Sequence, residues 1–493
     1  VPGRAGGGGA LRGRLGEVGA IDEEQGSRFL REYKASRPFK PVTIKLRISD
    51  DEAARFAVNR WRFPGVDLVP YLGRVYPHGP LLAHVVGYVG RVDEKDQAAL
   101  GPAGGAYSHV GKTGLERYYD DLLRGKPGFR RLETNVDGRT VRALDTVPAT
   151  PGTDLQLSID LDLQQAMVDA FGELEGTAVA VDPRTGEVLA MVSLPAYDTN
   201  LFVNGISHAD YKALQDNPSR PQFNRLVLGG VAPGSTIKPL TTLAGLDSGV
   251  RRPEDRILST GVFRLPGMRG RGWLDGVHGW TDARKAIYES VNTYYYQLAL
   301  DMGVQRYDTY MERYGFGQNT GIDLAGEIEG IVPSPASKRQ YEKKARWYPG
   351  DLVNASIGQG LWKVTPLQLV RGVAAIADDG RMRRPHLVAS TRPRFDAPWQ
   401  PLPQAEPIRI SDDAGHVRVV QEGMQMTTTG SGTAARIFRG TPYLSAGKTG
   451  TAQVVNRGVR AVDPRSLPLW KRHRGLYIGY APADAAKIAL AIA

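Results

Sequence analysis

The hydrophobic pattern along the chain becomes more regular near residue 152. Before this point, short extended segments surround a helical pattern over Asp50–Arg60, which is typical of an α+β domain. After it, Leu155–Ile159 alternates like a strand, and Asp160–Leu174 repeats apolar residues at helical spacing. The Thr-Pro-Gly at 150–152 is a turn signal, so we place the main domain boundary there.

Beyond this boundary the pattern predicts strands, then helices, then strands again. Two apolar runs flank a polar turn and predict a hairpin over residues 177–192. Helices are predicted at Ser235–Leu246, Asp282–Met302 and Pro366–Asp378, and strands at Tyr443–Val455, Leu476–Tyr480 and Ala486–Ala493. This order predicts one sheet assembled from both ends of a large domain.

The start of the chain differs from both of these parts. Residues 1–37 are rich in Gly and Arg and are predicted to form a flexible, poorly packed leader. The predicted organisation is therefore a leader at 1–37, an α+β domain at 38–153 and a larger domain at 154–493.

Composition removes several kinds of chemistry. The 493 residues include no cysteine, which excludes disulfides, thiolate metal sites and a cysteine nucleophile. The net charge of +11 would suit an anionic partner, but no run of six like charges and no RNA-binding signature accompanies it. No apolar stretch of about 18 residues could span a bilayer, and the chain starts at Val1, so we expect that an N-terminal anchor has been removed.

Two Ser-x-x-Lys pairs are candidates for serine chemistry. Ser235 and Lys238 precede an apolar helical pattern, which places them on one face of a helix N-terminus. A desolvated lysine there could accept the serine proton, although a capping serine beside a solvated lysine is the simpler interpretation. Ser445 and Lys448 lie on a predicted strand, where residues three apart face opposite sides and do not form a pair.

Two other short motifs accompany these pairs. Ser290-Val-Asn292 is the only Ser-x-Asn in the chain, and Lys-Thr-Gly occurs at 112–114 and 448–450. A phosphate-binding loop would need glycine five positions before the Gly-Lys-Thr, where Ala106 and Pro442 stand, so both copies fail that test.

Ser-x-x-Lys, Ser-x-Asn and Lys-Thr-Gly in this order resemble the motifs of penicillin-binding proteins and serine β-lactamases. The surrounding sequences Pro233–Pro239, Thr293–Gln297, Ile357–Gly360 and Gly447–Gln453 are similar to those of class B penicillin-binding proteins. Upstream, Phe63–Val66, Tyr76–Gly79, His84–Gly90 and Gly111–Arg117 resemble the non-catalytic, dimerisation-like pedestal of the elongation group, penicillin-binding protein 2. The implied fold is an α+β pedestal followed by an α/β transpeptidase domain, an antiparallel sheet flanked by helices.

The resemblance implies a peptidoglycan D,D-transpeptidase needed for cell-wall elongation and rod shape. Ser235 would attack the penultimate D-Ala carbonyl of a stem peptide and form an acyl-enzyme, and Lys238 would take its proton. Ser290 would relay that proton to the leaving amine, and Asn292 would hold the substrate backbone. A neighbouring stem peptide resolves the ester, and β-lactam antibiotics are trapped as the same ester.

The remaining implied roles belong to the second Lys-Thr-Gly. Lys448 would add positive potential, and Thr449, Gly450 and Thr451 would bind substrate, the two threonine hydroxyls through its carboxylate. The backbone N–H groups of Ser235 and Thr451 would form the oxyanion hole. Lys112-Thr-Gly114 would be a pedestal turn with no catalytic role, and Val291, where some relatives carry Asp, would point away from the cleft.

The resemblance also bears on metals and cofactors. Asp275–His278 lies in a region where some relatives hold a metal with help from a cysteine, and this chain has none. The eight histidines show no paired metal-ligating spacing, so we predict no metal and no cofactor. The aromatic run Tyr294–Tyr296 is most simply helix packing with one face near the cleft.

The implied partners are stem peptides ending in D-Ala-D-Ala, β-lactams, a membrane glycosyltransferase and scaffold proteins of the elongation complex, the last two through the pedestal, but no nucleic acid. The implied location is the bacterial inner membrane, with the catalytic domain in the periplasm. Three alternatives stay open: a β-lactamase or carboxypeptidase, a catalytically silent β-lactam sensor or scaffold, and a nucleic-acid-binding protein that rests on charge alone.

Overall fold

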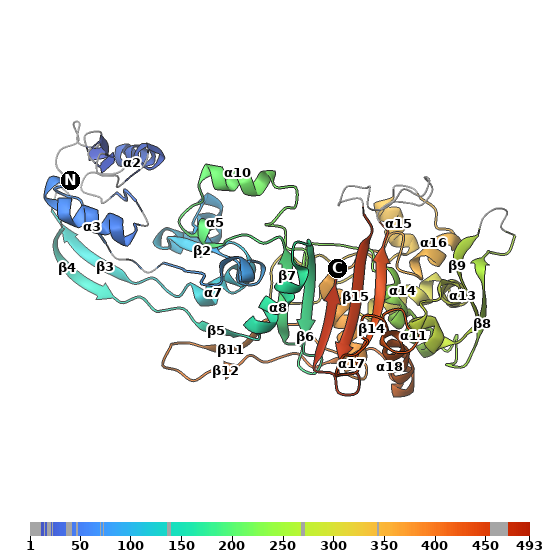
Figure 1. The fold of residues 1–493 in the computed structure, drawn as a ribbon. Coiled ribbons are helices and arrows are strands. Elements are labelled where there is room, and N and C mark those ends of the chain that lie inside the picture. Colours follow the sequence, from blue (N-terminus) through green and yellow to red (C-terminus); the bar gives the residue numbers. More distant parts are fainter. Residues whose placement is uncertain are drawn as a thin grey trace.

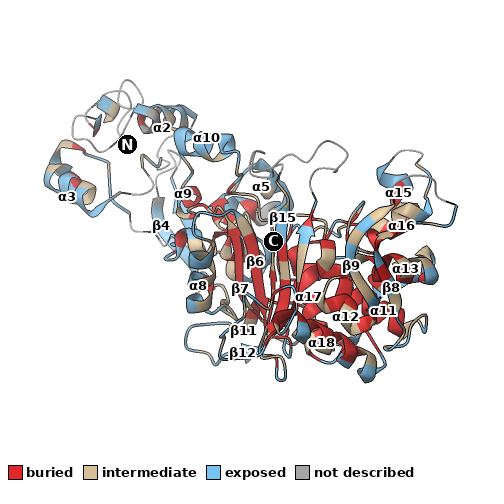
Figure 2. Ribbon diagram, turned by 45° about the vertical axis from the view of Figure 1, so that its right-hand side comes forward, coloured by how far each residue is buried: buried red, intermediate tan, exposed pale blue. Residues whose placement is uncertain are grey.

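The structure is a computed structural model that describes residues 11–493 apart from positions 14, 17–20, 22, 36–41, 46–47, 70, 72, 136–139, 268–271, 343–344 and 454–471. An elongated N-terminal portion joins one end of a larger C-terminal portion (Figure 1). Most buried residues belong to the larger portion, where they line the sheet and the helices beside it (Figure 2).

Short helices and two-stranded sheets make up the N-terminal portion. Its elements are α2 (Glu23–Ala35), α3 (Asp50–Asn59), η1 (Arg60–Arg62), η2 (Gly79–Leu82), α4 (Ala83–Val86), β1 (Val89–Arg91), α5 (Glu94–Leu100), η3 (Gly101–Ala106), β2 (His109–Gly111), α6 (Gly114–Tyr118), α7 (Asp120–Leu123), β3 (Phe129–Thr134) and β4 (Thr140–Val147). A capping box starts α3, because the Ser49 hydroxyl accepts from Glu52 N and the Glu52 carboxylate accepts from Ser49 N. The helix predicted at 50–60 is therefore confirmed.

Part of the stretch predicted as a loose leader is helical. Helix α2 lies within it, and Leu15 and Ile21 are buried against Phe56 of α3 and Phe63 in a small apolar cluster. The described residues of this stretch thus pack onto the pedestal, because scattered apolar side chains find partners that a Gly- and Arg-rich composition does not reveal. The domain boundaries at 37 and 153 stay a prediction.

A five-stranded antiparallel sheet forms the framework of the C-terminal portion. In spatial order its strands are β14 (Ala446–Ala452), β15 (Arg474–Ala481), β16 (Ile488–Ile492), β6 (Gly176–Val181) and β7 (Val188–Leu194). Strands from the two ends of the domain meet where β16 pairs with β6, with Leu490 opposite Ala180. The prediction of one sheet built from both ends, including the hairpin at 177–192, is confirmed.

Helices pack on this sheet and on one another to form the main core (Figures 1 and 2). They are α8 (Leu161–Phe171), η4 (Gly234–Ile237), α11 (Lys238–Asp247), α12 (Ala283–Tyr288), α13 (Asn292–Met302), α14 (Val304–Arg313), α15 (Pro335–Tyr341), α16 (Pro349–Ala355), α17 (Pro366–Ala377) and α18 (Ala414–Thr428). Two further helices, α9 (Asn200–Val203) and α10 (His208–Asp216), lie beside the pedestal instead, where α9 packs in small apolar clusters and α10 has no fully buried residue (Figure 1). Every residue of α17 from Pro366 to Ile376 is buried or nearly so, which confirms the predicted helix and places it inside the domain. Among the described residues, no helix has the length and apolar character needed to cross a membrane.

Smaller sheets complete the domain. Their strands are β5 (Asp154–Leu157), β8 (Ile257–Phe263), β9 (Trp273–Thr281), β10 (Arg381–Met382), β11 (Val388–Arg392), β12 (Gln400–Pro401) and β13 (Ile408–Arg409). Strands β8 and β9 pair as a hairpin at the end of the domain farthest from the pedestal, beside α13 (Figure 1).

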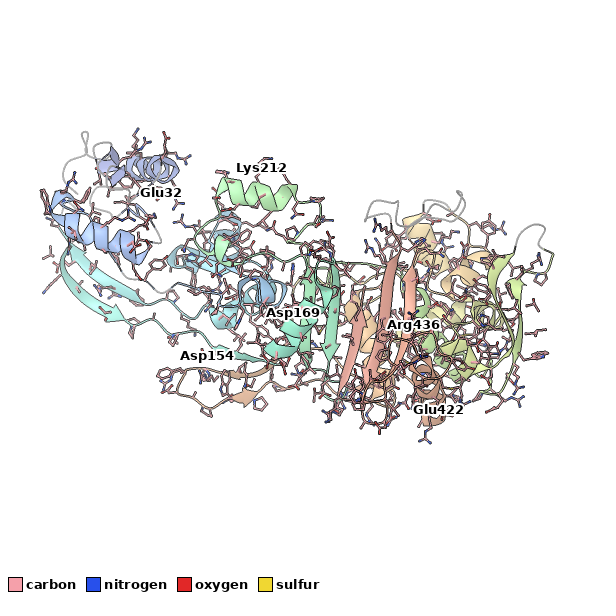
Figure 3. The ribbon with its side chains drawn as sticks, in the orientation of Figure 1. Glu32, Asp154, Asp169, Lys212, Glu422 and Arg436 are labelled. Carbon is pink, nitrogen blue, oxygen red and sulfur yellow. The ribbon has the colours of Figure 1, made fainter. Side chains whose placement is uncertain are left out.

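Hydrogen bonds join the pedestal to the C-terminal portion. Gln164 of α8 donates to Leu81 O at 3.0 Å and to Met191 O at 2.9 Å, and Tyr119 OH donates to the buried Asp323 at 3.0 Å. A cavity of about 710 Å³ lies at this junction. Asp154, labelled in Figure 3, lines it and forms an ion pair with Arg392 at 2.7 Å.

Candidate active site

Three segments far apart in the chain meet beside β14, at the edge of the central sheet. They are the turn η4 with the start of α11, the loop between α12 and α13, and β14 itself. The approach of η4 to β14 is very close, because a Cβ placed on Gly234 would lie 2.5 Å from Thr451 O and 3.1 Å from Thr451 N. Gly234 also has a φ of +52°, so glycine is required there for both conformation and space.

Ser235 and Lys238 share one face of a 3₁₀ turn. Lys238 N donates to Ser235 O, which closes the i to i+3 bond of η4 before α11 begins. Residues three apart in a 3₁₀ helix eclipse one another, so the two side chains lie on the same side. The structure thus places Ser235 and Lys238 on a tighter turn than the α-helix expected from the pattern.

The Lys238 amine is buried in contact with the Ser-x-Asn motif. Its Nζ donates to Ser290 O at 2.7 Å, to Ser290 Oγ at 3.1 Å and to Asn292 Oδ1 at 2.6 Å, and lies 5.1 Å from the centre of the Tyr295 ring. Burial, and next the positive charge of Lys448, lower the pKa of Lys238 well below its usual value, while Asp275 acts in the opposite direction. The surroundings of Lys238 therefore favour a neutral amine.

A break between two helices places Ser290 in this site. The helical segment predicted at Asp282–Met302 is confirmed on both sides of the motif but is interrupted there, since α12 ends at Tyr288 and α13 starts at Asn292. Ser290 has a φ of +60°, and the N–H groups of Ser290 and Val291 bond back to Ile287 O and Ala286 O. This turn directs both the carbonyl and the hydroxyl of Ser290 to Lys238, whereas Val291 is buried in the core, away from the site as expected.

Strand β14 presents two kinds of side chain. Lys448 is fully buried, its Nζ donates to Thr449 O at 2.9 Å, and burial lowers its pKa to about 7. Thr449 and Thr451 lie on the opposite face of the strand and are more accessible, and Thr449 Oγ1 is 3.1 Å from Thr433 Oγ1. The hydroxyls of Thr449 and Thr451 thus lie on the accessible face of β14, and the Lys448 amine lies on its buried face.

The segment at 357–360 holds the turn and the strand together. Gly234 N donates to Gly358 O at 2.9 Å, and Gln359 Nε2 donates to Thr451 O at 2.9 Å. Because β14 is the edge strand of the sheet among the described residues, no described strand covers its backbone groups on this side. Ser235 and Thr451, whose N–H groups were expected to form an oxyanion hole, are therefore close neighbours.

Other residues that the sequence analysis considered as candidates lie outside this site or pack in the core. Lys112 binds Asp93 at 2.9 Å and also Asp96, both in the pedestal. Ser445 precedes β14, and Tyr294–Tyr296 are all buried, so the tyrosine run packs the core. Within the part of the chain that the structure describes, no group of three or more His, Asp or Glu side chains could hold a metal ion.

Sequence reasoning did not assign a role to Asp275, Gln359 or Thr433 in the site. Asp275 accepts hydrogen bonds from Thr293 N at 2.6 Å and Thr293 Oγ1 at 2.8 Å, next to Asn292. No local pattern marks these three residues, because each enters the site through a contact across the fold. The resemblance offered a signal for two of them: Ile357–Gly360 includes Gln359, and Asp275–His278 lies in a region where some relatives hold a metal.

Comparisons with known proteins agree with this geometry. The penicillin-binding protein transpeptidase domain matches residues 176–493, and the penicillin-binding protein dimerisation domain matches residues 11–157. The chain belongs to the penicillin-binding proteins. Peptidoglycan D,D-transpeptidase MrdA of Salmonella typhimurium is 37% identical, over 98% of this chain and 79% of that protein. MrdA of Acinetobacter baumannii is 38% identical, over 96% of this chain and 70% of that protein.

Solved structures of penicillin-binding protein 2 share the same fold. The Pseudomonas aeruginosa PBP2 in complex with WCK 5153 has a TM-score of 0.74 and 38% identity, covering 86% of this chain and 87% of that one. PBP2 of Helicobacter pylori in its complex with MreC has a TM-score of 0.85 and 26% identity, covering 100% of this chain and 88% of that one. The expected fold, a pedestal followed by a transpeptidase domain, is confirmed.

The function expected from the resemblance follows from these relatives. This penicillin-binding protein is a serine-type peptidoglycan D,D-transpeptidase of cell-wall elongation, of the penicillin-binding protein 2 type. Its substrates are peptidoglycan stem peptides, and it binds β-lactams. The relatives thus favour a transpeptidase over the hydrolase, sensor and nucleic-acid alternatives.

Proposed function

We propose that Ser235 is the nucleophile of this transpeptidase and that Lys238 is its general base. The supporting observation is the buried Lys238 amine bonded to Ser290 and Asn292. A neutral amine has two N–H donors and one lone pair. The two N–H groups can stay bonded to Ser290 O and Asn292 Oδ1 while the lone pair takes the Ser235 proton as the hydroxyl attacks the D-Ala carbonyl, and the ammonium so formed has a third N–H for Ser290 Oγ.

The proton then moves toward the leaving group. The 3.1 Å contact between Lys238 Nζ and Ser290 Oγ supports a relay in which Ser290 passes the proton to the departing D-Ala amine. Asn292 holds the stem-peptide backbone through its amide. An amine of a second stem peptide attacks the resulting ester, which releases Ser235 and forms the cross-link.

Strand β14 would bind the substrate and stabilise its charge. The accessible hydroxyls of Thr449 and Thr451 suit the terminal carboxylate, and Lys448 supplies positive potential when it is protonated. Gly450 between the two threonines lets η4 approach the strand, since a Cβ there would lie 2.7 Å from Thr236 Cγ2. The N–H groups of Ser235 and Thr451 would stabilise the oxyanion, because donors fixed before the reaction need no reorganisation as charge develops.

Mass spectrometry of the acyl-enzyme tests the assignment of the nucleophile. The protein is incubated with a thioester or peptide that ends in D-Ala-D-Ala, quenched in acid and digested. We expect the added acyl mass on the peptide that contains Ser235. An adduct on Ser445 or on no serine would contradict the proposal.

We further propose that the pedestal binds elongation partners at the periplasmic face of the inner membrane. These are a scaffold protein, as in the MreC complex of the Helicobacter pylori relative, and a membrane glycosyltransferase. The β3–β4 hairpin supports a docking role because it exposes Phe129, Val141 and Leu144 by 53% or more of their surface. Large exposed apolar side chains on one element are candidates for an interaction surface.

The double substitution Val141→Ser and Leu144→Ser should reduce glycan polymerisation by the partner without changing acylation of this protein. We expect labelling by a fluorescent penicillin to stay within about twofold of wild type, because the hairpin lies far from the active site (Figure 1). Glycan polymerisation by a reconstituted glycosyltransferase should fall severalfold, because apolar anchors dominate such interfaces. Phe395→Ser, at an equally exposed position of the catalytic domain, is the control. Unchanged polymerisation by the double variant would show that this hairpin is not the docking surface.

A further inference from the structure

The β8–β9 hairpin lies directly behind the Ser-x-Asn motif. Strand β9 carries Asp275 and His278, whose side chains are largely buried, and the hairpin packs beside α13, which begins at Asn292 (Figure 1). Neither residue touches the acyl-transfer atoms assigned above. Their contacts nevertheless fall on the two residues that flank the motif.

Asp275 binds the residue that follows the motif. One carboxylate oxygen accepts from both the backbone N–H and the hydroxyl of Thr293, at 2.6 and 2.8 Å. Ser259 Oγ extends the network, since it contacts Thr293 Oγ1 at 3.3 Å and donates to Gly276 O at 3.0 Å. The Asp275 side chain is only 5% exposed, so water competes little for these bonds.

His278 binds the residue that precedes the motif. Its Nδ1 is 2.7 Å from a carboxylate oxygen of Glu289, and Lys285 Nζ donates to His278 O at 2.6 Å. Glu289 is followed directly by Ser290, whose φ of +60° is unfavourable for a serine. Such a conformation persists only where the surrounding structure enforces it.

We propose that β9 positions the catalytic Ser290–Asn292 segment, with Asp275 acting through Thr293 at one end and His278 acting through Glu289 at the other. Asp275 and His278 are positioning residues, and the inference rests on the roles proposed for Ser290 and Asn292. Holding both flanking residues fixes the Ser290 carbonyl and hydroxyl and the Asn292 amide at Lys238. A displacement of about 1 Å in such a site can lower a rate about 100-fold.

Asp275 also contributes charge to the site. The groups whose charge or ring faces Lys238 are Lys448 of β14, Asp275 of β9 and Tyr295 of α13. The Asp275 carboxylate raises the pKa of Lys238, whereas burial and the positive charge of Lys448 lower it. Loss of this carboxylate should therefore lower the pKa of Lys238 further. The acid limb of the pH profile, where the acylation rate falls as Lys238 becomes protonated, should then move to lower pH.

Acylation kinetics over a range of pH test the proposal. The variants Asp275→Asn, His278→Ala, Thr293→Val and Thr293→Ser are compared with wild type, using a fluorescent penicillin under single-turnover conditions. We expect acylation to slow by about 10- to 100-fold in Asp275→Asn and Thr293→Val. His278→Ala should slow less, and Thr293→Ser should stay within about threefold of wild type because it keeps the hydroxyl. The acid limb should move to lower pH in Asp275→Asn only.

Controls separate positioning from general damage and from failure of the proposed function. Val277→Thr changes an exposed residue on the same strand and should acylate like wild type. Thermal unfolding identifies any variant that does not fold, and the Thr293→Val and Thr293→Ser pair decides the question if Asp275→Asn unfolds. Near-wild-type rates in Asp275→Asn and Thr293→Val would overturn the positioning role, and a pH profile of Asp275→Asn that does not move would overturn the contribution of the Asp275 charge. An adduct located elsewhere than Ser235 in the wild-type protein would instead contradict the proposed function itself.

Discussion

Replacement of Ser235 by alanine is expected to abolish covalent labelling by a fluorescent penicillin. The alanine variant has no hydroxyl on the turn that faces Lys238, and no ester can form. Loss of a nucleophile that acts together with its base lowers rates by about 10⁴-fold or more in serine enzymes. Intact-mass measurement after incubation should therefore show the adduct on the wild-type protein and unmodified mass for Ser235→Ala.

Ser445→Ala is the matched control for this experiment. Ser445 has the same Ser-x-x-Lys spacing, but it precedes β14, and its buried Oγ has no hydrogen-bond partner among the described residues. We expect Ser445→Ala to label like wild type. Labelling of Ser235→Ala, or a loss of labelling in Ser445→Ala alone, would mean that the nucleophile is misassigned.

Replacement of Lys238 by arginine should slow acylation by about 1000-fold, within the range for loss of a general base. Arginine keeps the positive charge but stays protonated at all accessible pH values, so it cannot accept the Ser235 proton. In the wild-type protein the rate should fall as pH drops through the pKa of Lys238, because the protonated amine is inactive. The rate that remains in Lys238→Arg should lack this acid limb.

Lys338→Arg controls for the substitution of a buried lysine by arginine. Lys338 is 9% exposed and pairs with Asp351 at 2.8 Å, away from the motifs that meet at β14. Its arginine variant should keep both the wild-type rate and the wild-type pH profile. An unchanged acid limb in Lys238→Arg would assign the titrating base to another group.

Regular patterns and short motifs predicted much of the catalytic domain. The alternation in Thr177–Val192 and the helical spacing in Pro366–Asp378 depend on contacts between near neighbours, which a sequence records directly. Lys238, Ser290 and Asn292 could be selected because their motifs, in this order, resemble those of penicillin-binding proteins, and the structure brings the three residues into hydrogen-bonding contact.

The left-handed turn at Ser290 could not be predicted in the same way. Residues 282–302 keep an apolar repeat through the interruption, and neither glycine nor proline marks it. A left-handed conformation is unfavourable for a serine. It is stabilised here by the Lys238 hydrogen bond to Ser290 and by the bonds that His278 and Asp275 make to the flanking residues. The parts of the site that pattern reasoning missed, such as Asp275 and Thr433, share this origin in contacts between distant segments.

The position of β16 has a consequence for when this enzyme becomes active. This strand pairs with β15 on one side and β6 on the other, yet it follows every other described element in the chain. During synthesis or export the nucleophile therefore emerges about 250 residues before the strand that joins the two halves of its sheet. Pairing between such distant segments is slow, so the edge of β6 stays unpaired until β16 has been synthesised and has folded against it. An exposed strand edge promotes aggregation, so we expect the nascent chain to need protection during this interval.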